Sequence, residues 1–446
     1  MLLFINILYI IYILTIVFFY YCIPSFKIDD EIRNKVYDNN SNIDYFLLDK
    51  NNNKFKLNKN FLEWLVGFSD AEGNFIITLR DNPSFKIEKM DILSFDDEKL
   101  KIKNISKFVN LTFQIGLHID NLNTLKIIQK EIKCGNISIS KNRCNFYVSD
   151  FYSIINIIIP IFNYFHLNST KYSQFIVFRN AAELIRSKLH LTDEGLSRII
   201  HLKNIANIDV YTPKSFNITN YWLLGFVEGD ATFSTGSIYR PRLRFECNIK
   251  EEKLFLNIQK YFGKGKVVTS SRIRNKIYKS VILDISDIKY FKFVLIPLYK
   301  NLNFYTNKYL DFCLWCNIVD LYYLGYHLTL EGKDLIKEIK SIMNRRRLIN
   351  KNENLYIKDV NIKIINLLNK PSPYVIQNGE RYKRINDKIF KFRKYKIIVI
   401  NKVENKEFIY ESLSEAARTL QISRKKIMSI LDTGLIYKNY IFNLYK

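Results

Sequence analysis

Cysteine is scarce in this chain of 446 residues, and the six cysteines are widely scattered. Too few are present, at spacings too irregular, to form a disulfide framework, which indicates a reduced compartment. Cys313 and Cys316 have the spacing of metal ligands, but no second Cys or His pair completes a tetrahedral site. Because they lie in an apolar run that is typical of a helix, we interpret both as core residues.

Acidic residues, proline and glycine are also in short supply. Asp and Glu number 43 against 68 Lys and Arg, and the resulting net charge of +25 favours a polyanionic partner, with nucleic acid ahead of an anionic membrane. The chain has only 8 prolines and 14 glycines, whereas Asn, Ile, Lys, Tyr and Phe are abundant. Codons rich in A and T impose such a bias whatever the fold, which indicates an organellar gene, with a mitochondrion favoured over a chloroplast. A hydrophobic content of 48% is ample for two or three packed domains.

A ten-residue phrase occurs twice, at 64–73 (WLVGFSDAEG) and 222–231 (WLLGFVEGDA). Each copy is an apolar helical run that ends in a carboxylate. Small residues lie four apart in each copy: Gly67 and Ala71, then Gly225 and Gly229. Such stripes allow two helices to approach each other backbone to backbone, so Gly67 and Gly225 are predicted at the helix interface.

Paired in this way, the two helices would bring Glu72 and Asp230 to one place. Two converging carboxylates are suited to holding a divalent cation through oxygen ligands, which phosphodiester hydrolysis requires. At these residues the chain resembles the LAGLIDADG homing endonucleases. The first copy has Glu72 where the family usually has Asp, and the second ends in Ala231 where Gly is usual.

The repeat extends well beyond the motif. Matching features follow each copy in the same order: an alternating strand (111–117; 243–249), a helix (123–132; 251–262), a Gly (Gly135; Gly265), a hairpin, a Lys-Tyr pair (171–172; 308–309) and a His-Leu-Thr-x-Glu-Gly phrase (190–195; 327–332). The motif carboxylates are 158 residues apart and the strand phenylalanines, Phe113 and Phe245, are 132 apart. We assign the difference of 26 to a polar surface loop inserted at 81–104.

The resemblance covers about residues 61–344 and implies an α+β fold. We expect two pseudo-symmetric αββαββα halves, 61–205 and 215–344, packed through the motif helices, with saddle-shaped sheets that bind DNA. The polar faces of the alternating strands are the predicted DNA-binding surface, which contains Thr112 and Gln114 in the first half and Arg240, Arg242 and Arg244 in the second.

The resemblance also implies roles at the metal site. Glu72 and Asp230 would hold Mg²⁺ or Mn²⁺, and the main-chain carbonyls of Ala71 and Gly229 would supply further ligands. Lys171 and Lys308 would polarise the water or the phosphate, the alternative being lysines that merely start a surface helix. Asp70 and Glu228 are expected to face away from the ion or to cap. A strand glutamine that some members place near the metal is not evident, because we take the comparable positions to be Leu117 and Ile249.

The two ends of the chain carry separate features. Residues 1–22 contain no charged residue and are long enough to cross a bilayer, so they are an anchor, a targeting segment or an exon remnant. Residues 23–60 and 345–390 are predicted linkers. In 391–446, a capping box at Ser412–Glu415 starts a helix through Leu420, and Ser423 caps a second helix, 424–431, closed by Gly434.

This tail resembles the nuclease-associated modular DNA-binding repeat, a helix-turn-helix unit. Its predicted DNA contacts lie where the second helix begins: Ser423, Arg424, Lys425 and Lys426. The alternative is a small α/β cap on the main body. For the whole chain we predict a monomeric homing endonuclease that cuts a long asymmetric duplex. The alternatives are a maturase that binds group I intron RNA and an inactive, membrane-anchored nucleic-acid-binding protein.

Overall fold

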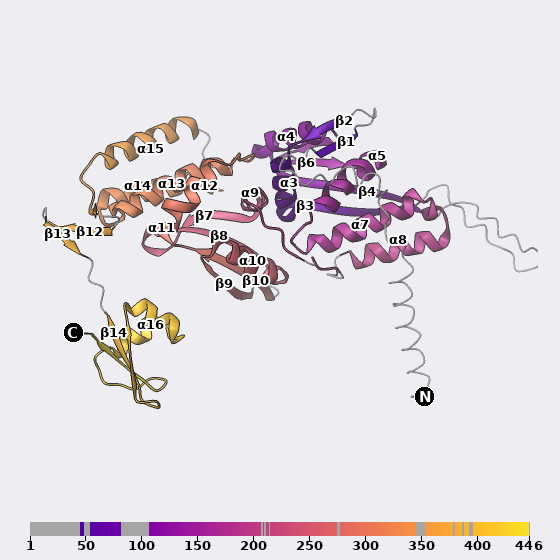
Figure 1. Ribbon diagram of the computed structural model, residues 1–446. Helices are drawn as coiled ribbons and strands as arrows, with labels where there is room; N and C mark the ends of the chain where they lie inside the picture. The colour runs from indigo at the N-terminus through magenta and orange to yellow at the C-terminus, as the bar shows by residue number, and fades with distance from the viewer. Residues whose placement is uncertain are drawn as a thin grey trace, which may run out of the picture. The chain divides into compact units, whose positions relative to one another are not determined.

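The computed structural model describes residues 45–48, 54–81, 107–206, 208, 211–213, 215–273, 277–344, 353–377, 380–385, 388–391 and 396–445 (Figure 1). The hydrophobic segment 1–22 and nearly all of the predicted insertion lie outside these residues. Among the described helices, none has the length and apolar character needed to span a membrane. The chain divides into two compact units, of which the first contains both motifs.

The first half begins with the motif helix, which runs directly into its sheet. Its elements are α3 (Lys59–Glu72), β3 (Gly73–Asp81), β4 (Lys107–His118), α4 (Leu122–Ile132), β5 (Asn136–Ser140), β6 (Arg143–Val148), α5 (Phe151–Ser153), α6 (Ile159–Tyr164), α7 (Lys171–Arg186) and α8 (Asp193–Ile205). The four strands form an antiparallel sheet in the order β3-β4-β6-β5.

The second half repeats this order. Its elements are α9 (Asn220–Asp230), β7 (Ala231–Thr235), β8 (Pro241–Asn248), α10 (Glu252–Phe262), β9 (Lys266–Ile273), β10 (Ile277–Ile285), α11 (Ile288–Tyr290), α12 (Ile296–Lys300), α13 (Lys308–Leu324) and α14 (Leu330–Ser341). The sheet order β7-β8-β10-β9 matches that of the first half. The predicted pair of αββαββα halves is therefore confirmed.

Alternating burial explains why each sheet has one apolar and one polar face. On β4, Leu111, Phe113 and Ile115 are almost fully buried, while Thr112 and Gln114 between them stay partly exposed. Leu243 and Phe245 are equally buried on β8. Because side chains alternate across a strand, the apolar set packs against helices and leaves the polar set available to solvent.

The strand register corrects the alignment of the two halves. Gly73 pairs with Ile115, whereas Ala231, its equivalent after the second motif, pairs with Phe245. The matching strand positions are therefore 130 residues apart, and pairing Phe113 with Phe245 was wrong by two residues. Two apolar residues separated by two positions lie on the same face, so the sequence pattern could not distinguish the two alignments.

The motif helices α3 and α9 touch backbone to backbone, as predicted. A methyl group added to Gly67 would lie 1.9 Å from the carbonyl oxygen of Trp222, and one added to Gly225 would lie 2.1 Å from that of Trp64. Both distances are far below van der Waals contact, so only glycine fits at either position. Asn58 and Thr219 cap the two helices by accepting backbone N–H groups three residues on.

Both predicted linkers contain regular structure where they are described, which corrects that interpretation. In the first, β1 (Tyr45–Leu48) and β2 (Lys54–Leu57) form a hairpin in which Phe55 and Leu57 are buried. In the second, α15 (Glu353–Leu368) is followed by a three-stranded sheet of β11 (Tyr374–Gln377), β12 (Glu380–Ile385) and β13 (Lys388–Lys391). The polar composition of both segments concealed these elements.

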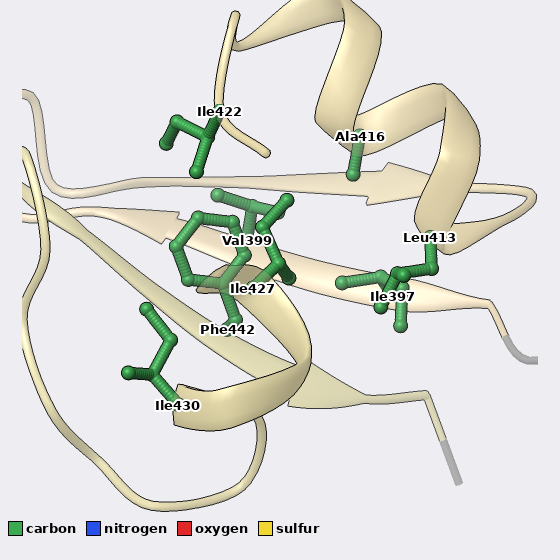
Figure 2. Packing of buried hydrophobic residues seen from close by; sticks show 8 residues of the cluster. All are labelled: Ile397, Val399, Leu413, Ala416, Ile422, Ile427, Ile430 and Phe442. Carbon is green, nitrogen blue, oxygen red and sulfur yellow. The ribbon is translucent and has the colours of Figure 1, made fainter. Parts of the chain in front are cut away.

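The C-terminal module has its own small core (Figure 2). Its sheet, in the order β15-β14-β16, consists of β14 (Ile397–Asn401), β15 (Lys406–Tyr410) and β16 (Tyr440–Leu444). Two short helices, α16 (Leu413–Thr419) and α17 (Arg424–Ile430), pack on this sheet. Apolar side chains from both helices meet Val399 and Phe442 of the sheet. Ser412 caps α16 by accepting the backbone N–H of Glu415, but the Glu415 carboxylate accepts from the backbone N–H of Glu411, one residue before the cap, so only half of the predicted capping box forms. α17 ends at Ile430 with Leu431 extended, so the assignment of Gly434 as its closing residue was wrong.

Replacing Gly67 or Gly225 with alanine is expected to force the motif helices apart. Overpacking of this kind costs about 1–3 kcal/mol, and more where the clash is with backbone. Chemical denaturation of Gly67→Ala and Gly225→Ala should show a lowered free energy of unfolding. Ser197→Ala on the exposed side of α8 is the control. Wild-type stability in both glycine variants would refute the close approach.

Candidate active site

Glu72 and Asp230 are the last residues of α3 and α9, where each helix turns into the first strand of its sheet. The two helix ends lie side by side, because a methyl group on Gly229 would be 2.2 Å from the Ala71 Cβ and 3.4 Å from the Glu72 Cγ. Burial raises the pKa of Glu72, and the neighbouring charge of Asp230 raises it further. The pKa of Asp230 is raised by burial as well.

Two lysines reach the same place from the start of a later helix in each half. Lys171 begins α7, and its Nζ donates to the carbonyl oxygens of Ala71 at 2.6 Å and Ser69 at 3.3 Å. Lys308 begins α13 and donates to the carbonyl oxygens of Ala231 and Gly229. Both lysines do start helices, but their ammonium groups lie in the site and not on the outer surface.

The electrostatics tie the four charges together. Burial lowers the pKa of Lys171 and of Lys308, and the carboxylates of Asp230 and Glu72 oppose this by favouring the charged ammonium. In return, both lysines lower the pKa of each carboxyl group. The site therefore brings together two carboxylates and two ammonium groups. The pairing of the motif helices predicted that the carboxylates converge, whereas the resemblance implied the lysines.

The donor set suits a hard divalent cation. Carboxylate oxygens are ligands that Mg²⁺ prefers, and Mg²⁺ commonly takes one or two of them while keeping several waters. Within the described part of the chain, no group of three or more His, Cys, Asp or Glu side chains could hold a metal, so other ligand positions would fall to water, phosphate or main chain. The carbonyl oxygens of Ala71 and Gly229, predicted as ligands, accept hydrogen bonds from the lysines.

The two earlier motif acids, Asp70 and Glu228, have a structural task, consistent with the expectation that they face away from the ion or cap. Asp70 accepts hydrogen bonds from the backbone N–H groups of Asn168 and Ser169, just before α7. Glu228 does the same for Tyr305 and Thr306, which precede α13. Each acid therefore fixes the loop that leads into the lysine helix of its own half.

Tryptophans from the opposite half complete these two sites. Trp222 of α9 donates its indole N–H to Asp70 at 2.8 Å, and Trp64 of α3 donates to Glu228. Both acids are buried, and desolvation raises the pKa of Glu228 to about 7. The first residue of each ten-residue phrase thus binds an acid near the end of the other phrase.

A second pair of contacts also crosses between the halves. Glu251 of the second half accepts hydrogen bonds from the backbone N–H and the hydroxyl of Thr170, the residue before Lys171. Asn121 of the first half accepts the backbone N–H of Asn307, the residue before Lys308. Sequence reasoning missed these contacts because nothing local marks either residue. Asn121 and Glu251 lie 130 residues apart and are therefore equivalent positions of the two halves, which only the strand register reveals.

Cys247 is a further residue that the sequence interpretation missed. Its Sγ donates to Asp230 at 3.3 Å. The corrected register makes Leu117 its equivalent in the first half, whereas Ile249, previously taken as that equivalent, lies beyond the end of β8 in a 3₁₀ turn. Asp230 therefore has a strand partner that Glu72 does not have at the same position.

The predicted DNA-binding side chains lie in the two sheets and in the C-terminal module. Thr112, Gln114, Arg242 and Arg244 lie on the polar faces of β4 and β8. Arg240 precedes β8 and donates its Nε to the carbonyl oxygen of Ser286. In the C-terminal module, Ser423 caps α17 by accepting the backbone N–H of Lys426. The basic residues that follow it are exposed.

Two αββαββα halves that share acids and lysines at the ends of one helix pair define a pseudo-dimeric, double-motif protein with a single central site. The LAGLIDADG endonuclease family model matches one stretch in each half, residues 65–182 and 223–319. The chain belongs to this family.

Relatives and solved structures agree with this assignment. Probable intron-encoded endonuclease 3 of Neurospora crassa is 29% identical over 303 residues, covering 60% of this chain and 55% of that protein. The uncharacterized mitochondrial protein RF1 of Saccharomyces cerevisiae is 23% identical, covering 87% of this chain and 83% of that protein. This chain thus spans about half the length of the first relative and most of the second.

The fold is shared with homing endonucleases solved on DNA. The I-LtrWI LAGLIDADG homing endonuclease bound to target DNA is 25% identical, with a TM-score of 0.53, and the match covers 65% of this chain and 99% of that chain. I-SmaMI, bound to uncleaved DNA in the presence of calcium ions, is 23% identical with a TM-score of 0.54, covering 64% and 98%. At this identity, the second match shows the fold alone.

Replacing Trp64 or Trp222 with phenylalanine should lower the free energy of unfolding. Each change removes a hydrogen bond to a buried carboxylate, which costs about 1.5–3 kcal/mol. Trp315→Phe is a matched control, because the Trp315 indole N–H donates to the neutral carbonyl oxygen of Ser234 in an equally buried setting. Denaturant titration should show larger losses for Trp64→Phe and Trp222→Phe than for Trp315→Phe. Equal losses would argue against the crossed contacts.

Glu228 is expected to make stability fall as pH rises from about 4.5 to about 7. Its pKa rises from 4.5 to about 7 on folding, so the folded state holds the proton longer than the unfolded state. This penalty is absent below 4.5 and complete above 7, where it reaches about 3 kcal/mol. As pH rises across this window, the free energy of unfolding of wild type should fall by that amount relative to that of Glu228→Gln. Parallel curves would contradict the raised pKa.

Proposed function

We propose that the chain is an intron-encoded, site-specific homing endonuclease that makes a double-strand break in a long asymmetric DNA site. The observation that carries the proposal is the convergence of Glu72, Asp230, Lys171 and Lys308 at the joined ends of α3 and α9. Family membership and a net charge of +25 support duplex DNA as the substrate.

Glu72 and Asp230 are the proposed ligands for Mg²⁺ or Mn²⁺. Such an ion, when bound, activates water and neutralises charge on the phosphate. The chain's own part is to hold two carboxylates close together although they repel each other, and the two neighbouring ammonium groups reduce that repulsion. A DNA phosphate entering this site would meet Lys171 and Lys308, both already desolvated and directed inward by the carbonyls they contact.

The lysines are proposed to stabilise the negative charge that develops on the scissile phosphate. Their lowered pKa values make each ammonium group a stronger proton donor than that of a solvent-exposed lysine. Thr170 and Asn307, which precede them, are held from the opposite half by Glu251 and Asn121. Each lysine therefore depends on both halves for its position.

We propose that the C-terminal module adds DNA affinity beyond the central site. Arg424, Lys425 and Lys426 are exposed at the start of α17, where basic side chains can contact phosphates. The composition and the fungal mitochondrial relative favour a mitochondrial gene. A monomer is proposed because the two halves already supply a complete pair of motifs within one chain.

Substituting both site carboxylates should abolish cleavage. Full-length protein would be incubated with Mg²⁺ and a duplex joining the exon sequences that flank its gene, beside a Glu72→Gln, Asp230→Asn double variant. Even the outer-shell partners of a metal are worth about 10–100-fold, so loss of both ligands should reduce cleavage by at least ~100-fold. DNA binding without metal should persist in the variant, since the positive surface is unchanged.

Three results of this experiment are informative. Cleavage by the parent and none by the variant would support the endonuclease and its two ligands. Equal cleavage by both proteins would place the metal site elsewhere. An inactive parent that instead binds the intron RNA tightly would favour the maturase alternative.

A further inference from the structure

The polar faces of the two sheets carry different side chains at equivalent positions. Asn74 and Thr232 each follow a site carboxylate by two residues, and each has a register partner on the next strand. The partner of Asn74 is Gln114, and that of Thr232 is Arg244. Gln114 and Arg244 therefore occupy the same place in the two halves, close in sequence register to Glu72 and Asp230.

A neighbour on the same face orients each of these side chains. The Gln114 amide nitrogen donates to the Asn145 side-chain oxygen at 3.1 Å. The Arg244 Nη2 donates to the Glu246 carboxylate at 3.0 Å, and Glu246 also accepts from Ser280. A side chain that is already oriented loses less conformational freedom when it binds a ligand, so both residues are suited to specific contacts.

Hydrogen-bond capacity remains after these contacts are made. Gln114 keeps one amide hydrogen and its oxygen acceptor, which together match the N7 and N6–H groups of adenine. Arg244 has five N–H donors and gives one to Glu246, which leaves enough for the N7 and O6 acceptors of guanine. The Arg244 side chain is 30% exposed despite its ion pair, so part of it remains accessible to a ligand.

The neighbouring position on the polar face of each strand, two residues earlier, shows the same contrast. Arg242 follows the pattern of Arg244, with its Nη1 3.5 Å from Asp284, whereas its equivalent in the first half is Thr112. A threonine hydroxyl does not make the two parallel hydrogen bonds that distinguish a single base. At these two equivalent positions, the second half therefore carries guanine-reading groups where the first half does not.

We propose that Arg244 reads a guanine and Gln114 reads an adenine at pseudo-symmetric positions of the DNA site. This inference rests on the proposed function and deepens it, because it specifies how the two half-sites differ. A palindromic target would present the same base to both residues and would satisfy only one of them.

The test is selection of duplexes from a library with a randomised 30-base-pair core, using the full chain with Ca²⁺ in place of Mg²⁺. Wild type, Arg244→Gln, Gln114→Arg and Glu246→Gln would be compared after sequencing. Arg244→Gln should change one selected position from guanine to adenine, and Gln114→Arg should change a different position from adenine to guanine. Each preference should be roughly 10- to 100-fold. Glu246→Gln should weaken the guanine preference without replacing it.

A matched control separates base reading from charge. Lys253→Gln removes one positive charge from the exposed side of α10 and should leave every selected base unchanged. If Arg244→Gln and Gln114→Arg only weaken binding uniformly across sequences, these residues contact phosphates and the inference is overturned. If wild type enriches no sequence at all, the proposed site-specific function fails, and that outcome is distinct from failure of the base assignment.

Discussion

The close approach of α3 and α9 is the constraint on which the rest of this structure depends. Gly67 and Gly225 allow each helix to press against a backbone carbonyl of the other, and no larger residue fits there. Only at this separation do the ends of the helices bring Glu72 and Asp230 together. Placing two carboxylates side by side in a partly buried position is unfavourable, and the charges of two nearby lysines offset that cost. The lysines in turn are positioned by the ordered loops that precede their helices.

Those loops are ordered by contacts that cross the helix pair. Asp70 and Glu228 fix the loops of their own halves, and Trp222 and Trp64 secure those acids from the opposite half. Glu251 and Asn121 add a second crossing contact directly before the lysines. Helix packing and the site chemistry are therefore one system, in which a change at the interface reaches the lysines through fixed hydrogen bonds.

Much of this arrangement could be predicted from the sequence, since the motif helices, alternating strands and lysine positions all recur in order. The expectation that Asp70 and Glu228 face away from the ion or cap also came from the sequence, because one helix face cannot direct two acids that lie two residues apart to one ion. The strand register could not be predicted, because shifting one strand by two residues against its equivalent leaves the same residues on the apolar face. Cys247 and Glu251 were missed for a related reason: their importance comes from partners far away in the chain, which only the folded structure brings near.

The reciprocity of the crossed contacts bears on how such a chain can arise. Every contact between Trp64 and Glu228 has a counterpart between Trp222 and Asp70, which is the arrangement that a two-fold axis produces between identical subunits. In such a dimer, any substitution is made twice. Once the copies are joined in one chain, each can change alone, and the differences between Glu72 and Asp230, Leu117 and Cys247, or Asn121 and Glu251 record that independence. Fusion thus permits departure from symmetry without giving up the shared interface.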